Sequence, residues 1–496
     1  MERSSGILIP IFSLPSNYGI GTLGKEAYEF VDFLEQADQK YWQILPAGSI
    51  SYGNSPYQSF SSFAGNPYFI DLDLLIEDGL LEKEEVQSKK WMKTLDKVDY
   101  GKIYQHRFDI LFEAYKRGIQ KDYDEFKSFV NEKSKWIHEY ALFMACKKHF
   151  DMVAWSNWPE DIRLHKKEAC LRYGELLKED VEFYQYIQYL FFKQWNQLRN
   201  YAHSKGIEII GDIPVYVAMD SCDVWSEPQW FYLDENNVPI EVAGCPPDSF
   251  SADGQYWGNP LYRYDAMKQD GYGWWIRRVD GAFQLYDVVR IDHFRGFESY
   301  WAIPYGAKSA KDGQWKKGPG MSLIGVLTSW FYNKQYIAED LGALTEEVIQ
   351  LVKDSHLPGM KVLQFAFDSR EAVNYLPYTY DRNCVCYIGT HDNMTCKQFF
   401  DQSPEEDVLF AKQYLGLNEE EGYVWGMIRA GMGCVADLFI CQMQDYLELG
   451  QEARINLPGT ASDNWEWRMK KGQNTTQLAK KIAEYTKRYG RSCHKD

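Results

Sequence analysis

The sequence predicts an α/β protein built on a (β/α)8 barrel of the TIM type. Short apolar runs rich in Val, Ile and aromatic residues alternate with segments of helical periodicity along most of the 496-residue chain. Acidic residues directly follow several of these runs, as they do at the rim where barrel enzymes keep their active sites. Length alone leaves the domain count open. Because barrels with insertions exceed the average domain size, we predict one barrel over residues 1–496.

The N-terminal segment has the pattern of a β-α-β unit. Residues 6–14 are an apolar β-type run, residues 25–37 place their apolar side chains on one helical face, and residues 41–45 form a second apolar run. Two consecutive strands joined by a helix pair in parallel, with a right-handed crossover. This unit therefore favours a parallel sheet.

The same strand signal recurs five more times. The runs cover residues 207–217, 288–294, 336–340, 360–367 and 385–390. Between two of them, Thr345 is a predicted N-cap for a helix that buries Val348, Ile349 and Val352. Together with an eighth strand expected in a poorly signalled stretch, these runs favour a closed barrel over an open doubly wound sheet.

Two segments interrupt this alternation. Residues 77–136 are highly charged and helix-like, with Lys and Glu mixed throughout, and predict a helical insertion. Residues 219–280 are rich in Pro, Gly, Trp and Tyr without long periodicity, and predict a loop-rich insertion. Loops of that length inside a compact fold are usually functional.

A glycine-rich turn near the N-terminus matches a dinucleotide-binding pattern. Residues 19–24 read GIGTLG, which fits G-x-G-x-x-G between a strand and a helix. In a dinucleotide-binding fold the next strand should end in Asp or Glu to bind the ribose, whereas residues 41–45 run into Pro46. We therefore interpret the glycines as turn residues. A nucleotide-dependent dehydrogenase is a distant alternative.

Composition argues against several classes of partner. The 54 Lys and Arg against 71 Asp and Glu give a net charge of −17, which disfavours phosphate backbones and anionic membrane surfaces. The ten cysteines form no C-x-x-C pair, and no stretch of 18 apolar residues or secretory pattern is apparent. We expect a cytoplasmic protein with reduced thiols that uses no metal or other cofactor and binds neither nucleic acid nor membrane. The sequence does not indicate an oligomeric state.

Carboxylates stand at the C-terminal ends of four predicted strands. They are Asp212, Asp292, Glu339 and Asp392. A single Asp at a strand end usually caps a helix or forms a turn. Four carboxylates at one rim would be costly to bury without a function, so we predict an active site there.

This set of carboxylates suits glycosyl transfer, because an oxocarbenium-like transition state needs an anion on one side and a proton donor on the other. Arg290 lies two residues before Asp292, so both side chains face the same way and the guanidinium would stabilise a nucleophilic carboxylate. Glu339 would need apolar or anionic neighbours that raise its pKa. His391 and Asp392 could then bind sugar hydroxyls. A carboxylate-bound Mg or Ca ion is the alternative, although no clustered Asp/Asn loop supports it.

These strand-end motifs resemble the conserved regions of the α-amylase superfamily and, in detail, those of its 4-α-glucanotransferase (amylomaltase, or disproportionating enzyme) family. Residues 211–217 read GDIPVYV, whereas typical α-amylases carry an Asn-His pair after that Asp. The other matching segments are residues 42–46 (WQILP), 55–59 (SPYQS), 65–68 (GNPY), 246–248 (PPD), 257–262 (WGNPLY), 457–460 (LPGT) and 464–465 (NW). The resemblance spans residues from about 6 to about 470.

The resemblance implies a barrel with insertions, without a C-terminal β-sandwich domain, and a role for each matching residue. Asp292 would be the nucleophile, Glu339 the general acid/base and Asp392 the stabiliser of the transition state. Seven further residues would bind substrate: Asp212, Arg290, His391, Tyr57, Ser55, Trp257 and Asn464.

Three finer expectations follow from the same resemblance and from strand geometry. Tyr57 would belong to a second, non-catalytic glucan-binding surface. The loop of residues 246–257, within the insertion at 219–280, would form the flap over the acceptor side. His293 points the other way along its strand from Asp292, so we expect it to be structural.

The implied activity is transfer of α-1,4-glucan segments between maltodextrin chains by a retaining double displacement. The substrates would be α-1,4-glucans and maltooligosaccharides, as both donor and acceptor. A hydrolase on the same scaffold, an α-amylase or a maltodextrinase, is the closest alternative. A non-catalytic glucan-binding protein is another, although such a protein would lack a carboxylate and none is missing here.

Overall fold

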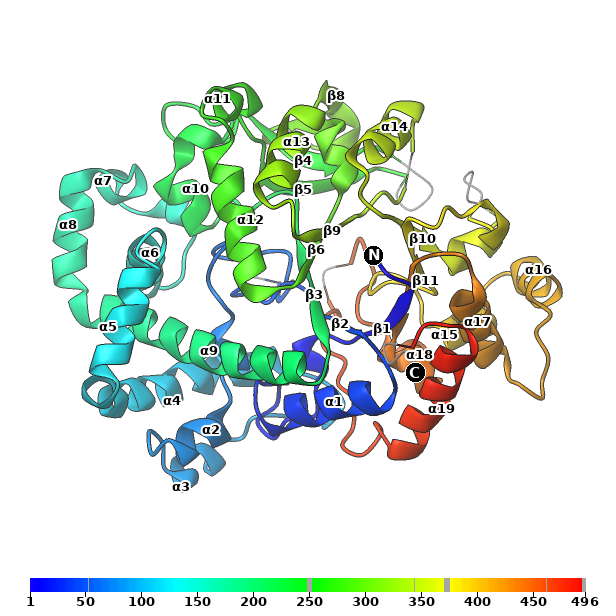
Figure 1. Cartoon of the computed structure of the whole chain (residues 1–496). Coiled ribbons are helices and arrows are strands. Elements are labelled where there is room, and N and C mark those ends of the chain that lie inside the picture. The colour runs from blue at the N-terminus through cyan, green and yellow to red at the C-terminus, as the bar shows by residue number, and fades with distance from the viewer. Residues whose placement is uncertain (52, 248–251, 343, 370–374, 461, 493–496) are drawn as a thin grey trace.

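Eight parallel strands form a barrel at the centre of the molecule (Figure 1). The computed structural model describes residues 1–51, 53–247, 252–342, 344–369, 375–460 and 462–492. The barrel strands are β1 (Ser4–Leu8), β2 (Tyr41–Gln43), β3 (Glu208–Ile213), β6 (Val288–Ile291), β9 (Gln335–Ala338), β10 (Gly359–Val362), β11 (Cys384–Tyr387) and β12 (Leu438–Gln442). Their order is β10-β11-β12-β1-β2-β3-β6-β9, and every paired neighbour is parallel. The predicted (β/α)8 barrel is therefore confirmed.

The two ends of this sheet, β9 and β10, meet and nearly close the barrel. The amide of Ala338 donates to the carbonyl of Pro358 at 2.9 Å, across the seam between the two strands. Because parallel strands have their carboxyl ends at one rim, residues that follow different strands become neighbours there.

A long helical region separates β2 from β3 and forms the lobe at the left of Figure 1. Its helices are α2 (Leu72–Glu77), α3 (Lys83–Gln87), α4 (Tyr100–Lys121), α5 (Tyr123–Glu132), α6 (Ile137–His149), α7 (Glu160–Arg163), α8 (Lys167–Leu176) and α9 (Lys178–Ser204). The helices thus continue well beyond residue 136, where α6 and α9 pack against each other and bury many apolar side chains.

A second, antiparallel sheet lies next to the barrel rim. Its strands are β4 (Glu241–Cys245), β5 (Gln255–Pro260), β7 (Ser299–Pro304) and β8 (Gln314–Lys317), in the order β5-β4-β7-β8. Strands β4 and β5 form a hairpin inside the segment 219–280, which the irregular sequence pattern did not indicate. Residues 248–251, between β4 and β5 in the sequence, lie outside the described residues, and so does that part of the predicted flap at 246–257.

The remaining helices surround the barrel or extend its loops. They are α1 (Lys25–Gln36), α10 (Cys222–Ser226), α11 (Tyr264–Gln269), α12 (Gly273–Leu285), α13 (Met321–Trp330), α14 (Glu346–Ser355), α15 (Cys396–Gln402), α16 (Glu405–Leu415), α17 (Tyr423–Gly433), α18 (Met443–Tyr446) and α19 (Thr476–Arg488). Thr345 caps α14 as predicted, since its side chain accepts from the amide of Val348. The predicted burial of Ile349 is wrong, because that side chain is 40% exposed and Leu351 takes the inward position.

The glycines of residues 19–24 allow close packing of the chain. A Cβ on Gly21 would lie 1.8 Å from the carbonyl oxygen of Ile11, and one on Gly24 would lie 2.1 Å from the carboxylate of Asp71. Gly24 is also the N-cap residue of α1. These contacts explain why the turn needs glycines without invoking a nucleotide.

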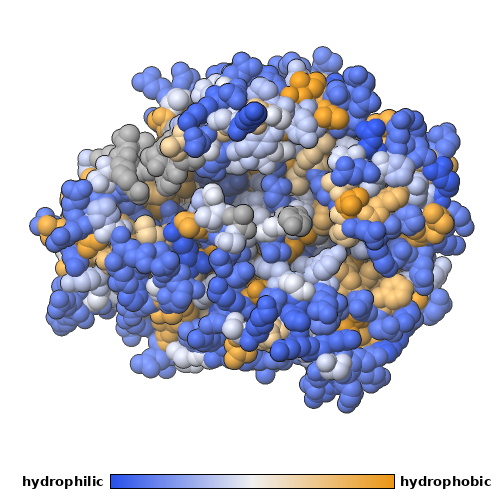
Figure 2. Space-filling model, turned by 180° about the vertical axis from the view of Figure 1, so that it is seen from behind, coloured by the Kyte–Doolittle hydropathy of each residue, from blue (hydrophilic) through white to orange (hydrophobic). Residues whose placement is uncertain are grey.

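The face of the molecule seen in Figure 2 is mostly hydrophilic, with hydrophobic side chains in small groups. Among the described residues, no helix has the length and apolar character required to cross a bilayer.

Candidate active site

Strands β3 and β6 bring together the first pair of candidate residues. Asp212 lies directly opposite Arg290 in the ladder, and both side chains are more than nine-tenths buried. Nη1 of Arg290 donates to Oδ2 of Asp212 at 2.6 Å and to Oδ1 of Asp292 at 3.0 Å. Burial raises the pKa of Asp212 to about 7, although the charge of Arg290 opposes this rise. One guanidinium thus binds two carboxylates.

Asp292 and Glu339 follow the ends of β6 and β9 at the same level of the barrel. The amide of Asp292 donates to the carbonyl of Ile213 at 3.0 Å, and the amide of Glu339 donates to the carbonyl of Ile291 at 3.0 Å. The hydrogen-bonded ladder is thereby extended by one residue beyond each strand. The Asp292 side chain remains 30% exposed, so it can be reached from the rim.

The carboxyl group of Glu339 is held by two backbone donors. Its Oε2 accepts from the amide of His293 at 2.7 Å, and its Oε1 accepts from the amide of Leu341 at 2.9 Å. Burial, reinforced by the nearby charge of Asp292, raises the pKa of Glu339 to about 8, while Arg290 and the two amides oppose the rise. Glu339 therefore carries a proton near neutral pH and is oriented by the backbone.

His391 and Asp392 face this group from the loop after β11, which is four strands away from β3 in the barrel order. Oδ1 of Asp392 accepts from Nδ2 of Asn456 at 2.6 Å, and its backbone carbonyl accepts from Nη2 of Arg454 at 2.7 Å. Nε2 of His391 lies 3.5 Å from Oδ2 of Asp392. Burial lowers the pKa of His391, which favours the neutral ring.

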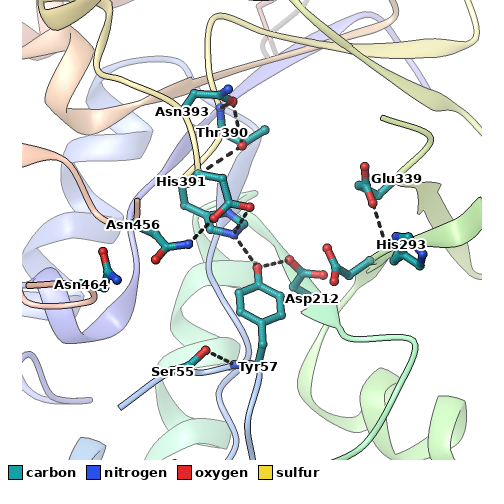
Figure 3. Close-up of polar contacts among 12 residues, drawn as sticks. Ser55, Tyr57, Asp212, His293, Glu339, Thr390, His391, Asn393, Asn456 and Asn464 are labelled. Atoms are coloured by element: carbon teal, nitrogen blue, oxygen red, sulfur yellow. Dashed lines mark hydrogen bonds and ion pairs between the residues drawn. The ribbon is translucent and has the colours of Figure 1, made fainter. Parts of the chain in front are cut away.

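Tyr57 links the two sides of the barrel mouth. Its hydroxyl donates to Oδ2 of Asp212 at 2.7 Å and lies 2.9 Å from Nε2 of His391, and its ring stacks on the imidazole at a centroid distance of 5.3 Å (Figure 3). The expectation that Tyr57 belongs to a separate, non-catalytic surface is therefore wrong. The tyrosine lies within the carboxylate cluster, because the loop after β2 folds over the barrel mouth.

The other predicted substrate-binding residues lie around this cluster. Ser55 accepts a hydrogen bond from the amide of Tyr57 at 3.3 Å. Asn464 bonds within its own loop, to the amide of Leu457 and to Thr460, and lies apart from the carboxylates in Figure 3. Trp257 lies on β5 of the antiparallel sheet.

Sequence reasoning missed two residues at the site, Asn456 and Arg454. Both bind Asp392 and both lie just before the LPGT segment that the family resemblance had identified. No local pattern distinguishes them, since their role depends on a contact across more than 60 residues. In the sequence, only their position just before the LPGT segment could have pointed to them.

Two cavities lie near the strand ends and the helical lobe. One of about 50 Å³ adjoins Asp212 and Tyr57, and none of the other three carboxylates lines it. Another of about 270 Å³ lies between the helical lobe and α12, where Trp136 and Arg277 line it, and none of the four carboxylates does.

The barrel and its rim define a class of enzyme that acts on glycosidic bonds, because a protonated carboxyl group stands beside an ion-paired carboxylate. Comparison with known proteins narrows this class. A family model described as 4-alpha-glucanotransferase matches residues 9–475. The 4-alpha-glucanotransferase of Clostridium butyricum is 49% identical over 97% of this chain and 99% of its own, and that of Thermus thermophilus is 42% identical over 98% and 99%.

A solved structure leads to the same family. The amylomaltase from Streptococcus agalactiae, determined in complex with acarbose, has a TM-score of 0.96 and 38% identity, and the match covers 99% of this chain and 100% of that one. The chain belongs to the 4-α-glucanotransferase family, whose activity is the transfer of α-1,4-glucan segments.

Proposed function

We propose that this chain transfers α-1,4-glucan segments by a retaining double displacement in which Asp292 is the nucleophile and Glu339 the general acid/base. The observation that carries the assignment is the contrast between the two carboxyl groups. Asp292 is paired with Arg290 and exposed at the rim, whereas Glu339 has a pKa raised to about 8. Two carboxyl groups with opposite environments are what a nucleophile and a proton donor require.

In the first step Asp292 attacks the anomeric carbon while Glu339 protonates the oxygen of the departing reducing-end fragment. A β-linked glycosyl enzyme forms, and the glycosidic C–O bond breaks as the new C–O bond to the carboxylate is made. The amides of His293 and Leu341 then stabilise the newly formed Glu339 carboxylate.

In the second step Glu339 acts as a base. It removes the proton from the 4-hydroxyl of an incoming glucan, whose oxygen attacks the same carbon from the opposite face and releases Asp292. The α-1,4 linkage is restored and Glu339 is protonated again. Each cycle thus conserves the number of glycosidic bonds.

The surrounding polar residues have matching roles in this proposal. Asp392, held by Asn456, opposes the positive charge that develops at the anomeric carbon. The buried network of Asp212, Tyr57 and His391 binds hydroxyls of the sugar at the cleaved bond. Ser55, Trp257 and Asn464 would contact the neighbouring sugars.

The substrates in this proposal are α-1,4-glucans and maltooligosaccharides, as both donor and acceptor. The amylomaltase from Streptococcus agalactiae binds acarbose, and the aromatic side chains of Tyr57 and Trp257 suit the apolar faces of glucosyl rings. A cytoplasmic location is likewise a proposal, which cell fractionation would test.

Product analysis on maltotriose tests the function. Transfer makes glucose and longer oligosaccharides at a constant number of reducing ends, whereas a hydrolase raises that number. We expect a constant number, with chains longer than maltotriose on the chromatogram. The Asp292→Asn variant should lose at least a thousandfold in rate, as expected for loss of a nucleophile. A steady rise in reducing ends without longer products would contradict the transferase assignment.

A further inference from the structure

His293 has an unusual backbone conformation directly after Asp292. Its φ and ψ angles are 50° and 47°, in the left-handed region that residues with a Cβ rarely occupy. Strained residues of this kind persist only where the surrounding contacts determine them, and they gather at functional sites. The contacts of His293 therefore deserve a functional explanation.

The backbone of His293 faces Glu339. The amide at this left-handed position donates to Oε2 of Glu339 at 2.7 Å, as the dashed line in Figure 3 marks. The φ angle of His293 sets the direction of its Cα–Cβ bond relative to this N–H, so an extended φ would place the ring elsewhere while the amide bound Glu339. The left-handed turn thus fixes the direction of the ring relative to one of the two donors that orient the Glu339 carboxyl group.

The ring of His293 faces a different element, the antiparallel sheet. It lies edge-on to the indole of Trp257 in β5, with a centroid distance of 4.9 Å and an interplanar angle of 89°. Tyr216 lies on another side of the imidazole, at 6.5 Å. Burial lowers the pKa of His293 to about 4, so the ring packs as a neutral aromatic at neutral pH.

We infer that His293 is a positioning residue that couples the seating of Trp257 to the orientation of Glu339. Trp257 lies within β5 of the antiparallel sheet, and Glu339 must be aligned with the acceptor hydroxyl in the second step. The ring of His293 contacts Trp257 and its backbone amide binds Glu339, so a single residue connects the two side chains. The inference rests on the proposed role of Glu339 and extends it to the choice between a sugar acceptor and water.

When Trp257 is displaced, the His293 ring loses its nearer aromatic neighbour and the strained turn can relax. The carboxyl group of Glu339 then keeps only the hydrogen bond from the amide of Leu341, while the charges of Arg290 and Asp292 still act on Glu339. A water molecule needs less exact alignment than a glucan hydroxyl. Loss of the contact should therefore reduce transfer more than hydrolysis.

A double-mutant cycle tests this coupling directly. His293→Asn removes the ring but tolerates the left-handed backbone, and Trp257→Leu removes the indole. With maltotriose as substrate, we expect His293→Asn to lower the ratio of transfer to hydrolysis at least tenfold in the parent enzyme. In the Trp257→Leu background the same change should alter the ratio less than twofold. Equal effects in both backgrounds would overturn the inference.

The chain offers a matched control for the strained backbone. His356 is also a histidine in the left-handed region, with φ of 56°, and it caps α14 away from the site. His356→Asn should leave the ratio unchanged, and a change there as large as that for His293→Asn would refute a specific role. If His293→Asn folds poorly, His293→Gly takes its place in the cycle, because glycine adopts the same backbone freely. The same fall in the ratio of transfer to hydrolysis is then expected.

The pH profile gives a second readout that a merely structural role would not move. Hydrogen bonds from amides stabilise the ionised Glu339, so a loosened His293 amide should shift the basic limb of the rate profile to higher pH. Trp257→Leu should shift this limb in the same direction, because the indole acts on Glu339 through His293, and Trp257→Phe should restore it in part. An unshifted limb in Trp257→Leu would overturn the inference. The proposed function would fail separately, if Glu339→Gln kept near-normal transfer.

Discussion

Glu339 illustrates how its surroundings turn an ordinary carboxyl group into a proton donor. Burial and the charge of Asp292 raise its pKa to about 8, against the opposing effects of Arg290 and two backbone amides. The folded state therefore disfavours the ionised form. As the pH rises through about 8, Glu339 loses its proton, and the stability that the neutral form confers at low pH is lost.

This environment predicts a pH-dependent stability change. Glu339→Gln mimics the neutral acid, so the variant should unfold at a higher temperature than the parent, by a margin that grows between pH 6 and pH 9. Thermal unfolding followed by circular dichroism at both pH values measures the margin. Glu29→Gln, on the exposed face of α1, is the control and should show no such trend. A margin that shrinks with rising pH would contradict the raised pKa of Glu339.

The hydrogen bond from Asn456 to Asp392 predicts that Asn456 affects the rate of the reaction. It donates to Asp392 at 2.6 Å, and hydrogen bonds to charged groups contribute about 1.5–3 kcal/mol. Asn456→Ala should therefore lower kcat by roughly ten- to a hundredfold, with little change in KM, because Asp392 acts chiefly in the transition state.

Steady-state kinetics on maltotriose checks this expectation. Asn383→Ala is the control, since Asn383 is exposed and donates to the carbonyl of His356, at the C-cap of α14. A raised KM at unchanged kcat would show instead that Asn456 serves ground-state binding.

At the scale of elements, strand β3 depends on a glycine. A Cβ on Gly211 would lie 2.1 Å from the ring of Tyr286, whose hydroxyl accepts from the amide of Ala47. This close approach gives a physical reason for the glycine in the GDIPVYV segment. The next residue along the strand is Asp212, which pairs with Arg290.

Gly211→Ala should consequently destabilise the protein by about 1–3 kcal/mol through overpacking, and lower activity by displacing Asp212. Urea unfolding measures the first effect and maltotriose turnover the second. Gly174→Ala, in α8 with open space around its Cα, should be neutral or slightly stabilising. An unchanged unfolding midpoint for Gly211→Ala would contradict the packing explanation.

The strands were predictable in kind but not in length. Residues 6–14 and 360–367 read as strands of eight or nine residues, whereas β1 and β10 end at Leu8 and Val362 and the chain then turns into short 3-10 helices. Apolar composition alone does not separate a strand from a buried turn. The eighth strand, β12, was not located because its five residues follow the apolar helix α17 without a clear break.

At the scale of the whole molecule, the sequence predicted the rim but not the contacts across it. Four carboxylates at strand ends follow from local patterns, since parallel strands share one rim. Tyr57 could not be placed in the same way. It comes from the loop after β2, and its hydroxyl meets residues 155 and 334 positions away. Such contacts depend on how the long helical lobe and the loops pack, which no local periodicity specifies.

The same limit applies to His293. Alternation along a strand correctly separates its ring from the Asp292 side chain, but the strand ends at Ile291 and the backbone turns left-handed two residues later. The ring therefore faces the antiparallel sheet while the amide faces Glu339. Function at this position depends on the arrangement of two separate sheets.

The double displacement requires a covalent glycosyl intermediate on Asp292, and trapping that intermediate is its decisive test. With a maltosyl fluoride as substrate, the fluoride ion leaves without protonation. The Glu339→Gln variant should therefore complete the first step and stall before the second. Mass spectrometry of the quenched protein should then find one added maltosyl unit, located on the peptide that contains Asp292. An adduct on another carboxylate, or turnover of the fluoride to a β-configured product without any adduct, would contradict the double displacement through Asp292.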